Sequence, residues 1–251
     1  MNIKTKSILA LATALIGTAA MAQTAAPESS LSFNVGVTSD YRFRSVAQTS
    51  FKPALQGGVD FAHASGAYVG AWASNVSWIK DYVGATDGTT EIDFYGGYKG
   101  EIAKDLTFDI GVITYQYPGN TADKVLVNAN TTEVYGALTF GIVTAKYSQS
   151  TGNFIANPNS QGSRYFELAA TFDLGGGFTL TPHVGRQTIP NQTNDAGDYT
   201  DFSLALGKDF GGGLTGSLTA YSTDTKDAFY KVGTFDNLGK SGLAVGIKYT
   251  F

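Results

Sequence analysis

The chain has 251 residues, of which 43% are hydrophobic and 13% aromatic, with a formal net charge of -4 and no cysteine. The lack of cysteine excludes disulfides and thiolate metal sites, and a mildly acidic chain without clustered Lys and Arg argues against nucleic acid as a partner. The length suits one barrel or one sandwich domain, and no apolar run after residue 22 is long enough for a spanning helix.

The first 22 residues contain the three parts of a secretory signal peptide. Lys4 and Lys6 form a basic n-region, residues 8–20 are apolar, and Ala-Met-Ala at 20–22 is a cleavage site. The apolar run is about 13 residues, whereas a spanning helix needs about 20. We therefore expect cleavage after residue 22 and export, followed by a short polar lead at residues 23–30.

From residue 31 onward, apolar and polar side chains alternate with period two, which is typical of β-strands. Leu106, Phe108 and Ile110, for example, oppose Thr107 and Asp109. The pattern predicts about 12 strands. They lie near residues 31–44, 54–63, 67–78, 91–101, 106–116, 132–140, 142–149, 164–174, 178–188, 200–210, 214–222 and 242–251. An even number fits a single-chain bacterial barrel.

The connections between the predicted strands alternate in length. Short turns are expected at 63–66, 102–105, 141, 175–177 and 211–213, and longer polar loops near 45–53, 79–90, 117–131, 150–163, 189–199 and 223–241. This alternation is typical of an outer-membrane barrel, with short periplasmic turns and longer external loops. A Greek-key sandwich needs connections that cross between sheets. We therefore predict an all-β, antiparallel, up-and-down transmembrane barrel over residues 31–251, in the outer membrane of a Gram-negative bacterium.

The last strand ends in an aromatic residue and has one apolar face. That face consists of Leu243, Val245, Ile247, Tyr249 and Phe251. Chain termini usually fray and stay polar, so this ending is unusual for a soluble protein. It resembles the terminal strand that the barrel-assembly machinery recognises. We expect that machinery and outer-membrane lipid as partners; nothing in the sequence predicts the oligomeric state.

The polar face of the predicted wall carries mixed charges, which we interpret as lumen-lining. The pore-lining candidates are Asp40, Arg42, Arg44, Glu91, Asp93, Lys99, Glu133, Arg164 and Arg186. Arg42 and Arg44, nearest the first external loop, are expected to form a constriction that faces Asp93 and Glu133. Eight strands leave room mainly for side chains and 16 to 18 leave an aqueous channel. About 12 strands allow either a narrow pore or a lumen closed by salt bridges.

The sequence offers little for catalysis, and we expect no enzyme activity, cofactor or metal. His63 and His183 are the only imidazoles. His63, with Ser65 beside it, falls in a predicted turn, and His183 has no identifiable nucleophile. The glycine triplets lack the Lys-Ser/Thr of a phosphate loop and read as hairpins. The expected function is passive diffusion of small hydrophilic solutes or ions; a non-conducting structural or adhesive barrel and a lipid-modifying barrel enzyme are the alternatives.

Seven short segments resemble the TorF-type porins, a family long known as a conserved bacterial protein of unknown function. They are SDYRFRSVAQT at residues 39–49, PALQGG at 53–58, WASNV at 72–76, EIDFYGGY at 91–98, YQYPG at 115–119, TEVY at 132–135 and DYTD at 198–201. The sequence departs at Ser45, where Gly is expected, and at Ala47, where Ser is expected, which bears on the conformation of the first loop. The resemblance implies an outer-membrane channel without a defined substrate.

Overall fold

The computed structural model describes residues 29–251, so the expected signal peptide lies outside the described residues. The wall is a closed antiparallel barrel of 12 strands, in which β10 and β11 act as one strand interrupted at Thr171. The wall strands are β1 (Ser29–Thr38), β4 (Ala54–His63), β5 (Ala67–Asn75), β6 (Thr90–Ala103), β7 (Leu106–Gln116), β8 (Thr131–Phe140), β9 (Val143–Ser150), β10 (Arg164–Ala170), β11 (Phe172–Gly175), β12 (Phe178–Thr188), β13 (Tyr199–Gly211), β14 (Leu214–Thr223) and β15 (Gly242–Thr250). The predicted fold class is confirmed.

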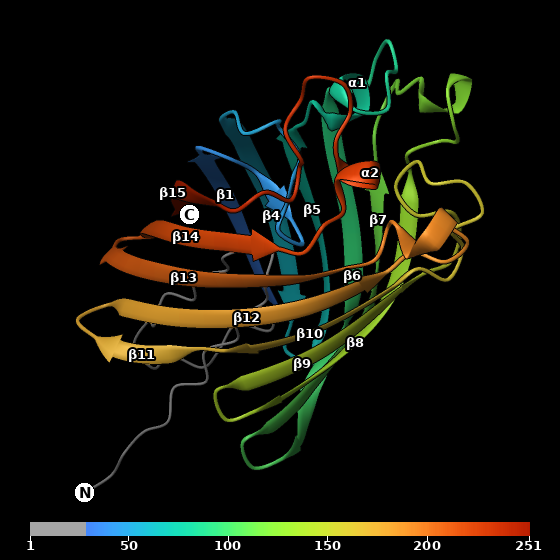
Figure 1. Ribbon diagram of the computed structural model, residues 1–251. Coiled ribbons are helices and arrows are strands. Elements are labelled where there is room, and N and C mark those ends of the chain that lie inside the picture. Colours follow the sequence, from blue (N-terminus) through green and yellow to red (C-terminus); the bar gives the residue numbers. More distant parts are fainter. Residues whose placement is uncertain (1–28) are drawn as a thin grey trace, which may run out of the picture.

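The barrel is up-and-down, and its first and last strands close it (Figure 1). Each wall strand pairs with its neighbours in the sequence, and β1 pairs with both β4 and β15. Closure extends to the last residue, because Phe251 donates its backbone N–H to Phe33 at 2.9 Å and accepts from it at 2.8 Å. The Phe251 and Phe33 rings stack at 5.8 Å. The wall therefore has no free edge along this seam below the loops.

Two strand predictions were wrong at their ends. The first strand was expected to reach residue 44, but β1 stops at Thr38 and the chain turns into the barrel. The strand expected at 67–78 ends at Asn75, and α1 (Trp78–Asp81) follows. The strand expected at 164–174 is split at Thr171, and the remaining strand ends agree within two residues. The period-two pattern thus located every wall strand but not the point where the first one leaves the wall.

The long connections gather at one end of the barrel, called here the loop end, and the short turns at the opposite turn end (Figure 1). The loop end carries α1, α2 (Asp227–Tyr230) and two 3-10 turns, η1 (Ala122–Lys124) and η2 (Thr193–Asp195). No helix among residues 29–251 is both long and apolar enough to cross a bilayer. The first connection, residues 39–53, folds inward and contains the hairpin of β2 (Arg42–Phe43) and β3 (Val46–Ala47).

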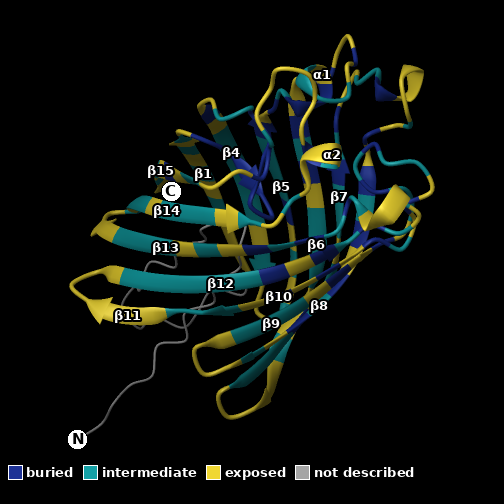
Figure 2. Cartoon of the chain, in the orientation of Figure 1, coloured by how far each residue is buried: buried dark blue, intermediate teal, exposed yellow. Residues whose placement is uncertain are grey.

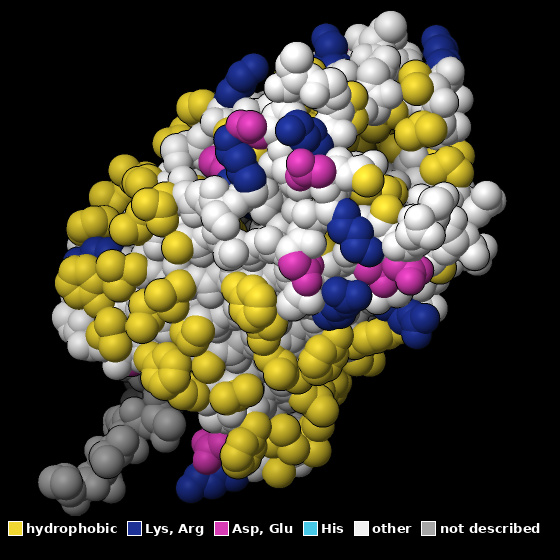
Figure 3. Space-filling view, in the orientation of Figure 1, with side chains coloured by type: hydrophobic (Ala, Val, Ile, Leu, Met, Phe, Trp, Pro, Cys, Tyr) yellow, Lys and Arg dark blue, Asp and Glu magenta, His cyan; other side chains and the backbone are white. Residues whose placement is uncertain are grey.

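The outer face of the wall is apolar. Leu31, Phe140, Leu204 and Leu243, from four different strands, are 60%, 67%, 47% and 67% exposed. Figure 3 shows hydrophobic side chains spread over the wall, while most charged side chains on this face lie toward the loop end. Isolated apolar residues are normal on soluble proteins, but a belt of this kind marks an interaction with another apolar phase.

The buried core lies inside the barrel at the loop end, not between two sheets. Its apolar members come from the inward-folded connection, from the loops and from the ends of wall strands. In Figure 2, buried positions concentrate in the loop half, whereas strands toward the turn end are half-buried or exposed. The interior is therefore filled near the loops and more open near the turns.

We predict that deleting Phe251 will destabilise the barrel, whereas Phe251→Leu will have a smaller effect. Deletion removes both backbone hydrogen bonds to Phe33, and two such bonds together contribute about 1–3 kcal/mol. The leucine keeps both bonds and loses only the ring stacking. Urea unfolding of refolded protein in detergent micelles measures the difference. Equal unfolding midpoints for the deletion and the wild type would show that this seam does not depend on its last residue.

Candidate functional site

Residues 39–53, called here the plug, fill the loop half of the lumen. The chain leaves the wall at Ser39, whose N–H donates to the Val245 carbonyl at 2.9 Å. Residues 40–49 are then all buried. Phe43 and Val46 face each other across the hairpin, so Arg44 and Ser45 form its two-residue turn. Both have positive φ, 48° and 64°, as a type I′ turn requires.

The turn of the plug is fixed by the guanidinium of Arg44. Its Nη2 donates to Glu133 Oε2 on β8 at 2.7 Å, and its Nη1 donates to Gln187 Oε1 on β12 at 2.8 Å. The Tyr165 ring lies 4.3 Å from the guanidinium carbon. A buried charge needs such partners, because removing one leaves an uncompensated ion in a low-dielectric interior. Arg44 therefore joins the plug to two wall strands, β8 and β12, which are separated by β9 and β10.

Two further hydrogen bonds hold the same turn against β13. Ser45 Oγ donates to Asp201 Oδ1 at 2.7 Å, and Tyr199 Oη donates to the Arg44 carbonyl at 3.0 Å. Asp201 is fully buried and also accepts from Tyr165 Oη at 2.8 Å. The departure from the resembled family at Ser45 thus falls on a residue in a glycine-favoured conformation whose side chain makes a specific contact.

The other arginine of the plug pairs locally. Arg42 Nε donates to Asp40 Oδ2 at 2.7 Å, and Arg42 Nη1 donates to the carbonyls of Ser45 and Lys240 at 3.1 and 2.7 Å. Burial raises the pKa of the Asp40 carboxyl above its usual value, and the Arg42 guanidinium opposes that shift. Arg42 therefore ties the plug to the last long loop and does not reach Asp93.

Aromatic rings also pack the plug against β5 and β7. Tyr41 meets Trp72 edge-on at 5.4 Å, and Phe43 meets Tyr115 in the same way at 5.2 Å. Tyr41 Oη also donates to Glu91 at 3.1 Å. Tyr41 thus makes both a ring contact and a hydrogen bond to the wall, and together with Phe43 it fixes the position of the plug.

Tyrosine hydroxyls satisfy many of the lumen carboxylates. Besides Tyr41–Glu91 and Tyr165–Asp201, the donor–acceptor pairs are Tyr68–Asp109, Tyr95–Asp60 and Tyr115–Glu133. Some of these tyrosines lie directly against glycines: a Cβ at Gly185 would come within 2.0 Å of Tyr165 Oη. Glu133 also pairs with Arg44, whereas the other four carboxylates accept hydrogen bonds from neutral hydroxyl groups and form no ion pair with Lys or Arg among the described residues.

A second polar cluster lies beside the plug, around His183. Its Nε2 is 3.0 Å from Glu167 Oε2 and 3.3 Å from Tyr165 Oη, and its Nδ1 is 3.6 Å from Asp201. Ser45 donates to Asp201 and not to the imidazole, so the group lacks the nucleophile–base contact of a hydrolase. The other imidazole, His63, is exposed at a turn with Ser65 Oγ at 2.8 Å. No group of His, Asp and Glu among residues 29–251 forms a candidate metal site.

The structure brings together only part of the predicted set. Arg44 and Glu133 meet as expected, and Glu91, Asp93 and Glu133 point into the lumen and are buried. Asp40, Arg42 and Arg44 lie on the plug and not on a wall strand. Lys99 faces inward at the exposed turn end, with its Nζ 5.6 Å from the Tyr68 ring.

Two of the predicted pore-lining residues do not face the lumen, so their assignment was wrong. Arg164 and Arg186 share the outward parity of Phe166 and Val184 on their strands, and both are exposed. Arg186 instead lies 3.6 Å from Asp198 at the loop end. Two important contacts of Arg44, Gln187 and Tyr199, were not among the candidates. Both lie on the inward face of the alternating pattern, which could have identified them, but the candidates were chosen by charge and neither residue is charged.

The five residues of the predicted assembly signal all face outward. Leu243, Val245, Ile247, Tyr249 and Phe251 are each at least 45% exposed. This places a continuous apolar stripe on the outside of the closing strand. Recognition of the stripe by assembly machinery stays a prediction.

Comparison with known proteins finds one matching family and a shared fold. A family model described as a bacterial protein of unknown function, Gcw_chp, matches residues 22–251. No curated protein matches the sequence. Among solved structures, the KdgM porin in complex with disordered oligogalacturonate is similar with a TM-score of 0.54 and 6% identity, covering 89% of this chain and 99% of that one. The NanC porin gives a TM-score of 0.54 and 10% identity, covering 88% and 99%.

We predict that Ser45→Ala will destabilise the barrel more than Ser45→Gly. Both variants lose the hydrogen bond to Asp201, but only alanine keeps the cost of a side chain at φ 64°. That conformation costs an L-residue about 1–2 kcal/mol, which is the expected difference between the two variants. Unfolding free energies from urea titration test it. Equal values would show that the turn relaxes out of the left-handed region when Ser45 is replaced.

Proposed function

The chain belongs to the Gcw_chp family of bacterial proteins, and we propose that it forms an outer-membrane channel through which small hydrophilic solutes and ions diffuse, with the plug as its constriction. The observation that carries the proposal is the closed barrel with an apolar outer belt and a charged interior, narrowed from one end by residues 39–53. An apolar belt suits a lipid environment, and closure leaves no unpaired edge in it. The mechanism involves binding and passage, with no bond made or broken.

The charge of the interior argues for a preference for cations. Carboxylates outnumber cationic groups among the inward-facing side chains. The carboxylates are Asp40, Asp60, Glu91, Asp93, Asp109, Glu133, Glu167 and Asp201, and the cations are Arg42, Arg44, Lys99, Lys146 and Lys248. Rings of acidic side chains favour cations in narrow pores. We infer that small cations and neutral hydroxylated solutes pass more readily than anions.

This charge distinguishes the proposed solute class from that of one structural neighbour. KdgM is described in complex with oligogalacturonate, a carboxylated sugar. Excess carboxylate in a low-dielectric lumen repels such an anion. The shared barrel supports a porin-like channel, while the lumen charge argues against the same substrate.

A non-conducting barrel is the second candidate, and the extent of the plug favours it. Residues 40–49 are buried throughout, and Glu133, Gln187 and Asp201 around them are fully buried. If the plug seals the lumen completely, the long loops become the functional surface. Conductance separates the two functions directly.

We predict discrete conductance steps for the refolded chain in a planar bilayer, with a cation-selective reversal potential in a salt gradient. Arg44→Ala should raise the single-channel conductance at least about two-fold, because it removes both anchors of the plug turn to β8 and β12. Arg186→Ala is the matched control, since this arginine lies on the outward face. A folded wild type and Arg44→Ala variant that never conduct would exclude the channel.

A pair of adjacent substitutions on β13 tests the proposed lipid contact. Leu204 faces outward and Ser203 faces the lumen. In a bilayer, Leu204→Arg should lower the free energy of unfolding by about 2–4 kcal/mol, because the charge lies against hydrocarbon. Ser203→Arg places the same charge in a polar lumen and should cost less. Urea unfolding in lipid vesicles gives both values, and equal losses would contradict a lipid-facing outer surface.

A further inference from the structure

The wall has a gap at the loop end of the seam between β1 and β15. β15 pairs with β14 from Gly242 onward, but its pairing with β1 begins only at Gly246. At Val245 the backbone N–H is taken by the Ser39 side chain at 2.9 Å, because the β1 backbone is already turning inward. Above this level β1 and β4 are both missing from the wall, since residues 39–53 connect them inside the lumen.

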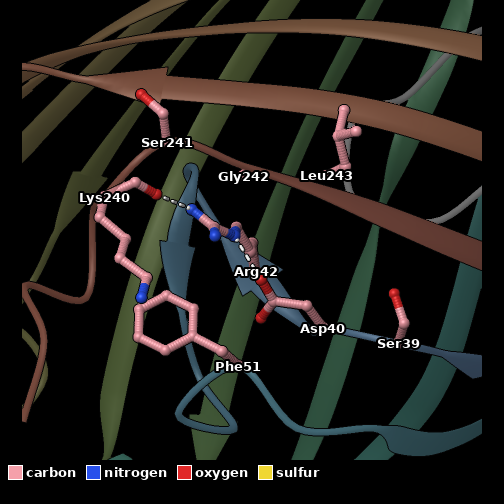
Figure 4. A pocket seen from close by; sticks show the side chains of 8 residues that line it. All are labelled: Ser39, Asp40, Arg42, Phe51, Lys240, Ser241, Gly242 and Leu243. Carbon is pink, nitrogen blue, oxygen red and sulfur yellow. Dashed lines mark hydrogen bonds and ion pairs between the residues drawn. The ribbon is translucent and has the colours of Figure 1, made fainter.

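A pocket of about 320 Å³ lies at this gap, between the plug and the start of β15 (Figure 4). It is lined by Ser39, Asp40, Arg42 and Phe51 from the plug side, and by Lys240 and Leu243 from the other. This seam pocket therefore lies between the end of β1 and the start of β15. Its floor is the Asp40–Arg42 ion pair.

Arg42 presents an uncommitted donor to the seam pocket. Its Nε and Nη1 are hydrogen-bonded, but its Nη2 has no hydrogen-bond partner among residues 29–251. The absence of a side chain at Gly242 creates the space, since a Cβ there would approach Arg42 Nη2 to 2.7 Å. Arg42 itself is only 7% exposed. A buried guanidinium with a free N–H is a strong, directional site for an anionic oxygen.

Lys240 supplies a second cation at the mouth of the same pocket. Its ammonium pairs with Asp236 and lies 4.5 Å from the centre of the Phe51 ring (Figure 4). Both members of the Lys240–Asp236 pair are largely exposed. Such surface pairs contribute little stability, so Lys240 can turn toward an incoming anion at small cost.

The surroundings of the seam pocket are those of a membrane interface. Leu243, which lines the pocket, is 67% exposed on the outer wall, and Val37 and Leu55 on the neighbouring strands β1 and β4 are 53% and 62% exposed. Lys240 and Ser241 lie directly above Leu243 in the chain and are polar. A ligand with an apolar tail and an anionic head could place its tail against Leu243 and its head beside Lys240 and Arg42.

We propose that the seam pocket binds the phosphate monoester of a lipid in the surrounding leaflet, held by Arg42 Nη2 and Lys240 Nζ. The acyl part lies along Leu243 on the outer wall. Because Asp40 keeps its bond to Arg42 Nε, phosphate adds to the existing ion pair without breaking it. The inference rests on the membrane location in the proposed function but not on conduction. Free phosphate has the same head chemistry and is the other possible source.

The test uses refolded full-length mature chain in non-ionic detergent micelles. Short-chain phosphatidic acid, phosphatidylcholine with the same acyl chains, and inorganic phosphate are each titrated calorimetrically. We expect one phosphatidic acid per chain, at least about ten-fold weaker binding of phosphatidylcholine, and a loss of at least about five-fold for phosphatidic acid in Lys240→Gln. Lys231→Gln is the control, because Lys231 also pairs with an aspartate four residues earlier and is 44% exposed against 45% for Lys240.

The outcomes separate the two sources of phosphate. Binding of phosphatidic acid without measurable binding of inorganic phosphate supports a lipid site, whereas equal, Lys240-dependent affinities support a site for free phosphate and overturn the lipid assignment. Equal losses in Lys240→Gln and Lys231→Gln, or equal affinity for both lipids, would overturn the site itself. Arg42→Gln, checked for folding by circular dichroism, should abolish binding. Conductance of Lys240→Gln should stay at the wild-type value, so failure of the channel proposal is distinguishable.

Discussion

Backbone pairing around the barrel is the constraint on which the other features depend. A chain with an apolar outer surface must satisfy its N–H and C=O groups within the wall, and β1 and β15 do so down to the contact of Phe33 with Phe251. Once the ladder is closed, every second side chain has to enter the lumen. The polar half of the sequence is thereby collected in one narrow space, where its charges must find partners or water.

The plug supplies partners for some of the lumen charges, but its departure from the wall also leaves part of β15 without a partner strand on one side. Arg44 gives Glu133 a partner, and Ser45 and Tyr199 join the same turn to β13. Meanwhile the withdrawal of residues 39–53 from the wall leaves β15 without a β1 partner above Val245, although β14 still pairs with it there. The filled lumen and the open seam are therefore two results of a single change in chain direction at Ser39.

Much of this fold is readable from the sequence, because period-two alternation reports directly which side chains share a face. It located the wall strands and the inward position of Glu91, Asp93 and Glu133. It could not show that the first strand ends at Thr38, since Tyr41 to Arg44 alternate as well: the plug hairpin is extended too, and extended backbone has the same period wherever it lies. Arg164 and Arg186 were assigned by charge against their own parity. At the loop end of a strand an outward charge reaches water, so the rule that charges face inward does not hold there.

The partners of the plug have a consequence for the order of folding. Its side chains contact residues 89, 143, 156 and 198 positions further along the chain, and contacts so distant in sequence are slow to form. Residues 39–53 are synthesised early, yet their binding places on β8, β12, β13 and the last loop are synthesised later. The wall strands that bind the plug must therefore be in place before the plug can make these contacts. From these long-range contacts we expect the barrel wall to form first and the plug to enter its interior in the last step of folding.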